Sequence, residues 1–244
     1  MTTMPSFPKA ELTLVALLPA LGAGCGGDDV TDLTGTVDVA IYGESFIEDG
    51  IPAAEMSDGW AVTFDRFDAT LSGVTLGGIV AGTSTVVDLS RSSQGSGHAV
   101  AAVELPEGEY NLAAYVLGPV VVEGSATRAE STVRFAWTFP ATRYSECEIA
   151  LTPPGRFEVT VHADHLFYDS LVSEDPALGF DALANADADA DGILTQAELA
   201  QADIGSYDPG SSGNISDLWT YLVALSRTLG HVNGEGHCPT ATAL

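Results

Sequence analysis

Apolar and polar positions alternate from Thr34 to about His165, in short stretches that Gly, Pro and Asp divide. Alternation over a few residues, bounded by turn residues, is typical of β-strands with one buried face. The pattern predicts strands at Gly35–Tyr42, Trp60–Leu71, Thr83–Leu89, Ala99–Glu104, Tyr110–Leu117, Ser131–Phe139, Glu146–Leu151 and Arg156–His162. A succession of such strands predicts an antiparallel β-sandwich.

The period of the pattern changes after His165 to that of helices. Helices are predicted at Phe180–Ala186, Gln196–Asp203 and Ile215–Leu229. Asn214, followed by Asp217 three residues later, predicts a capping box at the start of the last helix, and Gly230 predicts its C-terminal cap. The predicted fold class is therefore mainly β with a C-terminal helical part. A sandwich domain is expected over residues 34–166 and a small helical module over residues 167–244.

One strand-forming segment resembles a known class of sandwich. The stretch LPEGEYNLAAYVLG, Leu105 to Gly118, is similar to the hairpin entry of transthyretin-like and other immunoglobulin-like β-sandwich modules. The resemblance implies a fold class and carries no function, since such sandwiches serve many unrelated purposes.

The acidic segment DADADGILTQAE, Asp187 to Glu198, resembles the EF-hand calcium loop. Carboxylates stand at loop positions one, three and five, a glycine stands at position six where the chain turns sharply, and the glutamate at position twelve can supply two oxygens. The resemblance implies calcium ligands at Asp187, Asp189, Asp191, Ile193 (through its carbonyl), Thr195 and Glu198. The alternative is an acidic connection that holds no ion, in which the carboxylates would repel one another.

EF-hand loops usually occur in pairs, and the chain has one poor second candidate. Residues 208–219 have Gly213 at position six, but Gly210 stands at position three and Trp219 at position twelve, where ligands are needed. A solitary loop predicts a structural or modest-affinity calcium site rather than a calcium switch. The helical module is thus expected to carry one EF-hand-type loop.

The N-terminal segment has the features of an export signal. Lys9 precedes the apolar run Leu12–Leu21, and small residues precede Cys25. This end resembles the lipobox of bacterial lipoproteins. The resemblance implies a signal peptide over residues 1–25, lipidation of Cys25 and a tether over residues 26–33.

Two cysteines remain besides the lipidated one. In an oxidising compartment Cys147 and Cys238 are expected to form a disulfide between the two domains, the alternative being a pair of buried thiols. The TPPG sequence at residues 152–155 predicts a hairpin loop between the strands at 146–151 and 156–162. In this hairpin Cys147 pairs with Thr160 and lies on the same face of the sheet as His162. The disulfide would then hold His237 close to His162.

Four of the five histidines lie in two short segments, VHADHLFYD and GHVNGEGHC. Imidazoles next to a carboxylate suit zinc or copper, whereas calcium prefers an all-oxygen loop. A second metal site is therefore predicted at His162, Asp164, His165, His231 and His237. The alternative is that these side chains hydrogen-bond the loop backbone around the disulfide. His98 is expected in an exposed loop, unrelated to this site.

The charge balance bears on partners and location. The chain has 34 acidic residues against 8 lysines and arginines, a formal net charge of −26. Nucleic acid is excluded as a partner, because its phosphates require a basic surface. The expected partners are a membrane, reached through the lipid anchor, and a protein or glycan ligand. The expected location is the cell envelope, at the outer membrane or cell surface, or otherwise the periplasm or the exterior.

No segment of the sequence matches a known catalytic motif such as GxSxG, HExxH or CxxC. The leading hypothesis is an exported, lipid-anchored calcium-binding module of the cell envelope that is not an enzyme and has a second, histidine-rich transition-metal site. The alternative is a secreted metal-dependent hydrolase that uses His162, His165, His231 and His237, with one coordination position open for water.

Overall fold

The structure is a computed structural model that describes residues 33–82 and 84–244. The predicted signal peptide, the lipidation site Cys25 and tether residues 26–32 lie outside this described part of the chain. The described residues belong to one compact unit, so the helical segment near the C-terminus packs together with the strands. Every helix within residues 33–82 and 84–244 is too short or too polar to span a bilayer.

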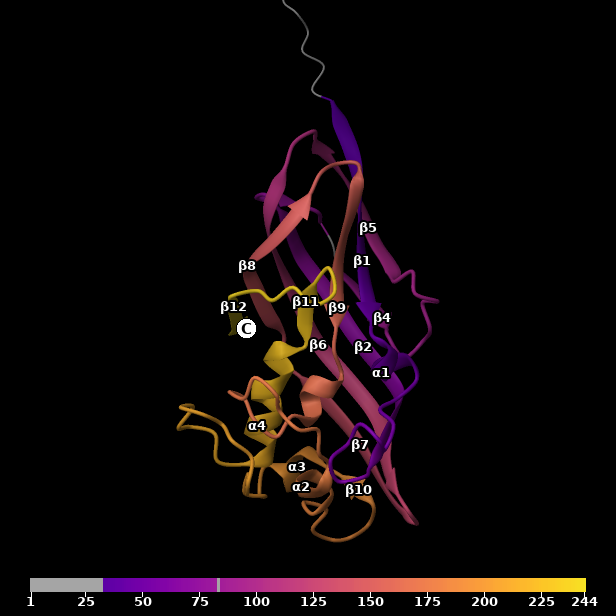
Figure 1. Cartoon of the computed structure of the whole chain (residues 1–244), viewed down its shortest axis with the longest axis vertical. Helices are drawn as coiled ribbons and strands as arrows, with labels where there is room; N and C mark the ends of the chain where they lie inside the picture. The colour runs from indigo at the N-terminus through magenta and orange to yellow at the C-terminus, as the bar shows by residue number, and fades with distance from the viewer. Residues whose placement is uncertain (1–32, 83) are drawn as a thin grey trace, which may run out of the picture. The chain divides into compact units, whose positions relative to one another are not determined.

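The described strands form two sheets, and the predicted mainly β, sandwich-like architecture is confirmed (Figure 1). The smaller sheet has the order β11-β9-β1-β5 and consists of β1 (Thr34–Gly43), β5 (His98–Pro106), β9 (Gly155–Val161) and β11 (Gly230–Val232). The larger sheet contains β2 (Ala61–Leu76), β3 (Ile79–Val80), β4 (Ser84–Asp88), β6 (Tyr110–Arg128), β7 (Ser131–Phe139), β8 (Thr142–Leu151), β10 (Ile193–Leu194) and β12 (Thr240–Ala243). Most neighbours are antiparallel, but β1 with β9 and β7 with β10 are parallel.

Strand β6 is the centre of the larger sheet and is longer than predicted. The prediction ended it at Leu117, whereas the strand continues to Arg128. Its first part pairs with β8 and its second part with β7, while β2 pairs along its other edge. The change of partner falls at Gly118 and Pro119. Because proline has no N–H to donate, it is tolerated where the ladder on that edge is interrupted.

The predicted hairpin between residues 146–151 and 156–162 is wrong. Strand β8 pairs with β6 and β12 in the larger sheet, whereas β9 lies between β1 and β11 in the smaller one. Residues 152–154 connect the two sheets instead, and three residues span about 10 Å, the usual distance between packed sheets. Residues 159–161 of β9 are all buried, so both faces of this strand are covered, as expected for a strand in the centre of a sheet.

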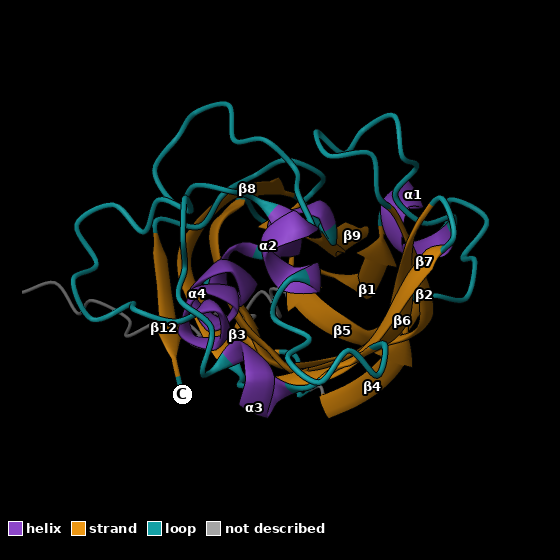
Figure 2. Ribbon diagram, turned by 90° about the horizontal axis from the view of Figure 1, so that it is seen from below, coloured by secondary structure: helices purple, strands orange, loops and turns teal. Residues whose placement is uncertain are grey.

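The helices are short and lie mostly after residue 163. They are α1 (Ser45–Glu48), the 3₁₀ helix η1 (Asp164–Phe167), α2 (Asp181–Ala184), α3 (Gln196–Leu199), α4 (Leu218–Leu225) and the 3₁₀ helix η2 (Ser226–Thr228). Figures 1 and 2 show α2, α3 and α4 grouped toward one end of the sheets. Strands β10, β11 and β12 come from the same part of the chain and add to both sheets.

Both predicted caps of the last helix are wrong. Asp217 is itself the N-cap of α4, since its carboxylate accepts a hydrogen bond from the backbone N–H of Thr220 at 2.9 Å. Gly230 begins β11 instead of ending the helix. A Cβ atom at Gly230 would lie 2.7 Å from the hydroxyl of Tyr115, which stacks on Tyr144. Glycine is therefore required at this position, because close packing leaves no room for a side chain. The same packing fixes the position of the next residue in the chain, His231.

Candidate functional site

Three segments bring the four predicted histidines together. His162 directly follows β9, and His165 lies in η1. His231 is the middle residue of β11, which pairs with β9 so that His231 lies opposite Thr160. The ring centroids of His162 and His231 are 4.3 Å apart, and those of His231 and His237 are 4.4 Å apart. The ring of His165 lies 5.4 Å from that of His162 and 5.1 Å from that of His231.

The disulfide between Cys147 and Cys238 is confirmed. Cys147 is buried on β8, and Cys238 follows His237 directly in the chain. The segment between β11 and β12 is thus fixed to the larger sheet by a covalent bond and by the pairing of β12 with β8. His237 is held near the other histidines as predicted, although through β11 and not through the predicted hairpin.

Glu44 orients His162 from the end of β1. One oxygen of Glu44 lies 3.2 Å from Nδ1 of His162, and the other accepts a hydrogen bond from the backbone N–H of Ala163 at 3.0 Å. Burial acts to lower the pKa of His162, but the hydrogen bond and charge of Glu44 outweigh it, so this pKa is raised. Burial also raises the pKa of Glu44. The carboxylate of Glu44 accepts from Nδ1–H, while Nε2 of His162 lies 3.5 Å from the carbonyl oxygen of Gly234, a long contact that a metal on Nε2 would replace.

The hydrogen bonds of His165 define its tautomer. Its Nδ1 lies 2.9 Å from the hydroxyl oxygen of Thr228, and that hydroxyl donates its only proton to the carbonyl of Leu225 at 2.8 Å. Nδ1 of His165 must therefore carry the proton that this contact needs, which leaves a lone pair on Nε2. Burial lowers the pKa of His165 despite the opposing charge of Asp164, so the ring is neutral at neutral pH.

His231 is the most deeply buried histidine of the cluster, with 2% of its surface exposed. Neither of its ring nitrogens has a hydrogen-bond partner among the described residues, and the closest carboxylate oxygen, from Glu235, lies 3.9 Å from Nδ1. Burial, with the neighbouring histidines adding to it, lowers the pKa of His231 to about 3. A buried polar group without a partner is costly. Coordination of a metal ion by a neutral imidazole would remove that cost.

Donor atoms of the cluster are close enough to share an ion. One donor atom each of His162, His231 and Glu235 lie within 4.8 Å of one another, and so do donor atoms of His162, Asp164 and His165. The hydroxyl of Tyr168 donates a hydrogen bond to one carboxylate oxygen of Asp164, Oδ2, at 2.9 Å. Four of the five residues predicted for the second metal site thus belong to these groups, and the fifth, the exposed His237, contacts the ring of His231.

Two carboxylates of the cluster were missed by the sequence prediction. Glu235 had a signal, because it lies between His231 and His237 in the same short segment. Glu44 had none, since only the parallel pairing of β1 with β9 brings it next to His162, far along the chain.

His98 also differs from expectation: it is the first residue of β5, is half-buried, and its ring lies 3.1 Å from the carbonyl of Arg91.

A cavity of about 500 Å³ opens against the histidine cluster. Its lining includes four groups of the cluster, and the remainder comes mainly from residues 168–176 and the end of α4. The lining residues are His165, Tyr168, Ser170, Leu171, Ser173, Glu174, Pro176, Leu225, Thr228, His231, Glu235 and His237. The cavity therefore reaches the cluster at His165, His231, Glu235 and His237, whereas His162 and Asp164 are not part of its lining.

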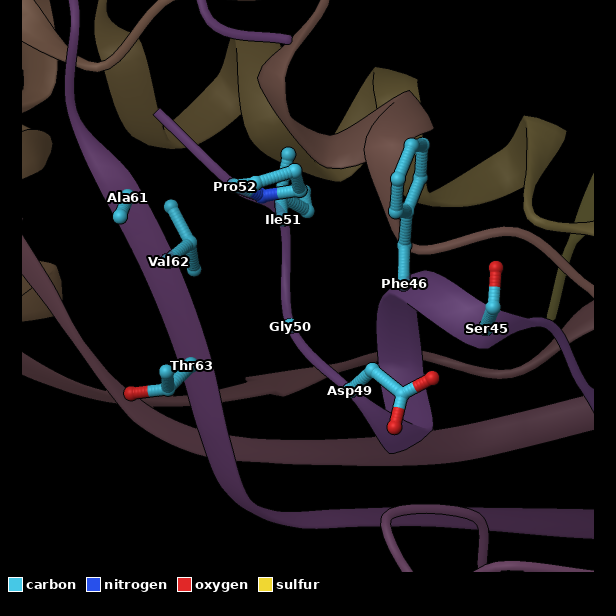
Figure 3. A pocket seen from close by; sticks show the side chains of 9 residues that line it. All are labelled: Ser45, Phe46, Asp49, Gly50, Ile51, Pro52, Ala61, Val62 and Thr63. Carbon is cyan, nitrogen blue, oxygen red and sulfur yellow. The ribbon is translucent and has the colours of Figure 1, made fainter. Parts of the chain in front are cut away.

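A second cavity, of about 410 Å³, lies between α1 and the start of β2 (Figure 3). The figure shows Ala61 and Val62 of β2 on one side and Phe46 of α1 on the other, with Ile51 between them and Asp49 as the one carboxylate. Its lining has neither a histidine nor a pair of carboxylates, so it offers no comparable set of metal ligands.

The acidic loop at residues 187–198 is folded around its own carboxylates. The side chain of Asp187 accepts hydrogen bonds from the backbone N–H groups of Asp191 and Gly192, at 3.2 and 2.9 Å. Glu198 accepts from the backbone N–H of Thr195 at 2.9 Å in a capping box at the start of α3. Oxygens of Asp187, Asp189 and Glu198 lie within 4.8 Å of one another. The predicted flanking helices are shorter than expected, as α2 and α3.

The loop pairs with the sandwich. Ile193 and Leu194 form β10, which runs parallel to Arg134 and Phe135 of β7. Leu194 is fully buried, whereas Ile193 is about half exposed. The short strand of the loop is thus attached to the edge of the larger sheet.

Protonation of the histidine cluster is expected to weaken the metal-free protein in mild acid. His231 stays neutral in the folded state down to about pH 3, whereas an unfolded histidine takes up a proton near pH 6.5. The unfolded state then binds more protons between these values, so stability falls as the pH is lowered. His165 acts in the same direction, and His162, with its raised pKa, acts in the opposite one.

Urea unfolding in chelator at about pH 7 and about pH 5 measures this dependence. The wild type should lose more stability over this range than a His231→Leu variant, which retains the carboxylates. Parallel losses in both proteins would contradict the assignment of a neutral, buried His231.

Comparison with known proteins gives no match: neither a protein-family model, nor a curated protein, nor a solved structure is similar to this chain at a significant level.

Proposed function

We propose that this chain is an exported metal-binding protein of the cell envelope. In this proposal the histidine cluster binds one zinc or copper ion, the loop at residues 187–198 binds one calcium ion, and lipidated Cys25 anchors the protein to a membrane. The sandwich would present these sites to a protein or glycan ligand. The buried ring of His231 lies among three further imidazoles and has no hydrogen-bond partner within the described part of the chain, which is the observation that supports the transition-metal site best.

The chemistry of the cluster favours a borderline transition metal over calcium. Neutral imidazoles prefer zinc and copper, and carboxylates such as Glu235 can complete a four-coordinate site. Glu44 and Thr228 each bond Nδ1 of one histidine, which makes Nε2 the donor in this proposal, and at His162 the metal would displace the 3.5 Å contact of Nε2 with the carbonyl of Gly234. Zinc titration of chelator-treated protein by calorimetry tests this, and binding of fewer than about one ion per chain would overturn it.

The calcium site rests on the EF-hand resemblance and on the carboxylates that converge in the loop. Asp187, Asp189 and Glu198 approach one another closely, which is unfavourable unless a cation lies between them. Because β10 attaches the loop to β7, a bound ion would stabilise the contact between α2, α3 and the sandwich.

Calcium is expected to raise the thermal unfolding midpoint. Calcium at about one hundred times its dissociation constant adds about 2.7 kcal/mol, which corresponds to a shift of about 5 to 10 °C for a chain of this size. Glu198→Gln should abolish the shift, because glutamine retains the capping box but loses the charged bidentate ligand. Scanning calorimetry with chelator and with calcium measures it. Equal midpoints would contradict the calcium site, and an equal shift with magnesium would contradict its selectivity.

A metal-dependent hydrolase is the second candidate, and the cavity against His231 favours it. A hydrolytic metal needs a position for water and space for a substrate beside it. Turnover of amide or ester substrates by zinc-loaded protein, lost in His231→Ala, would support this candidate over a pure binding module.

A further inference from the structure

The cavity beside the histidine cluster has one wall that is built from candidate metal ligands. His165, His231, Glu235 and His237 all line it, whereas His162 is outside its lining. Tyr168 adds a hydroxyl that is engaged with Asp164. An ion held by His162 and His231 would therefore face protein on one side and the cavity on the other.

We propose that the bound metal keeps one coordination position open to this cavity, and that the position takes a neutral or cationic small ligand with a nitrogen or oxygen donor. This inference rests on the proposed transition-metal function. It adds which side of the ion is reactive and which class of ligand can reach it.

The charge of the lining sets the ligand class. Glu174 and Glu235 contribute carboxylates, and the cavity has no arginine or lysine in its lining. A whole-chain charge of −26 adds to the same field. The two carboxylates offset the charge of a bound divalent ion, and the acidic surface around the cavity disfavours the approach of anions such as phosphate, whereas it does not disfavour neutral or cationic ligands.

The remaining lining provides apolar surface beside the donor position. Leu171, Pro176 and Leu225 line the same cavity as the histidines and offer contacts for the carbon part of a ligand. A small number of polar groups within an apolar lining is the usual composition of a ligand pocket. Imidazole, which has one donor nitrogen and an apolar edge, is the probe that fits this description.

The test uses cobalt as a spectroscopic substitute for zinc. A visible absorption band on adding cobalt reports metal binding, and its change on adding imidazole reports the open position. In wild type we expect a saturable change with cobalt retained on the protein, and at least about tenfold weaker binding of inorganic phosphate. Glu174→Lys should bring phosphate binding closer to that of imidazole.

A paired substitution tests the location. Leu171→Trp should fill the cavity, preserve the cobalt band and weaken imidazole binding by at least about tenfold, whereas Val172→Trp, at an exposed position outside the lining, should change neither. A cobalt band that does not respond to imidazole in wild type would show closed coordination and overturn this inference alone. Equal binding of phosphate and imidazole would overturn the ligand class. The lack of any cobalt band would overturn the proposed function itself.

Discussion

Replacing His231 by alanine is expected to lower zinc affinity by about a hundredfold or more, because it removes the ligand at the centre of the cluster. The double replacement His162→Ala and His237→Ala should abolish retention of a transition metal. Calorimetric titration with zinc, after the removal of bound metal, measures both effects.

In the same titration, two further variants distinguish metal ligands from residues that only lie near the cluster or orient a ligand. His98→Ala is the matched control, because His98 lies on β5 outside the cluster and should leave zinc affinity unchanged. Glu44→Gln should weaken zinc binding by about 10- to 100-fold, since it retains the shape of the side chain but removes the charge that orients His162. Unchanged zinc affinity in His231→Ala would eliminate the site.

Removing the disulfide is the second change with a large expected effect. Cys147 and Cys238 are 91 residues apart in the sequence, and closing a loop of this length stabilises the folded state by about 4 to 5 kcal/mol in the chain-entropy account. The double variant Cys147→Ala and Cys238→Ala should lose that amount in urea unfolding. It should also bind zinc more weakly, because His237 is then held only by β11 and β12.

Reductant provides the control for this prediction. Wild type in reductant should unfold at nearly the urea concentration of the double variant, and the double variant should not respond to reductant. If the variant and the oxidised wild type have equal unfolding free energies, the disulfide has no part in stability and its proposed role in placing His237 fails.

Much of the strand pattern could be predicted from the sequence because alternation is a local signal. Strand β7 matches the prediction at both ends, and β1, β5 and β9 differ by one or two residues. The exceptions have specific causes. Strands β2 and β6 extend beyond the predicted ends because they cross irregularities in the ladder, and alternation is lost at such points.

Sheet membership could not be predicted, because it depends on contacts between distant segments. Residues 152–155 have the composition of a hairpin turn, yet they connect two sheets. Strands β10, β11 and β12 contain two to four residues each, too few for a periodic signal. The residues of the histidine cluster were nevertheless predicted. The expected disulfide limited the position of His237, and the histidines lie in only two short segments of the sequence. Glu44 was missed because its partner, His162, is adjacent only after β1 and β9 pair.

The most direct test is the metal content of the mature protein, purified from an oxidising compartment without chelator or added histidine tags. Plasma mass spectrometry should find about one calcium ion and about one zinc or copper ion per chain. Calcium alone would contradict the transition-metal centre formed by His162, His231 and their neighbours, which is the central claim.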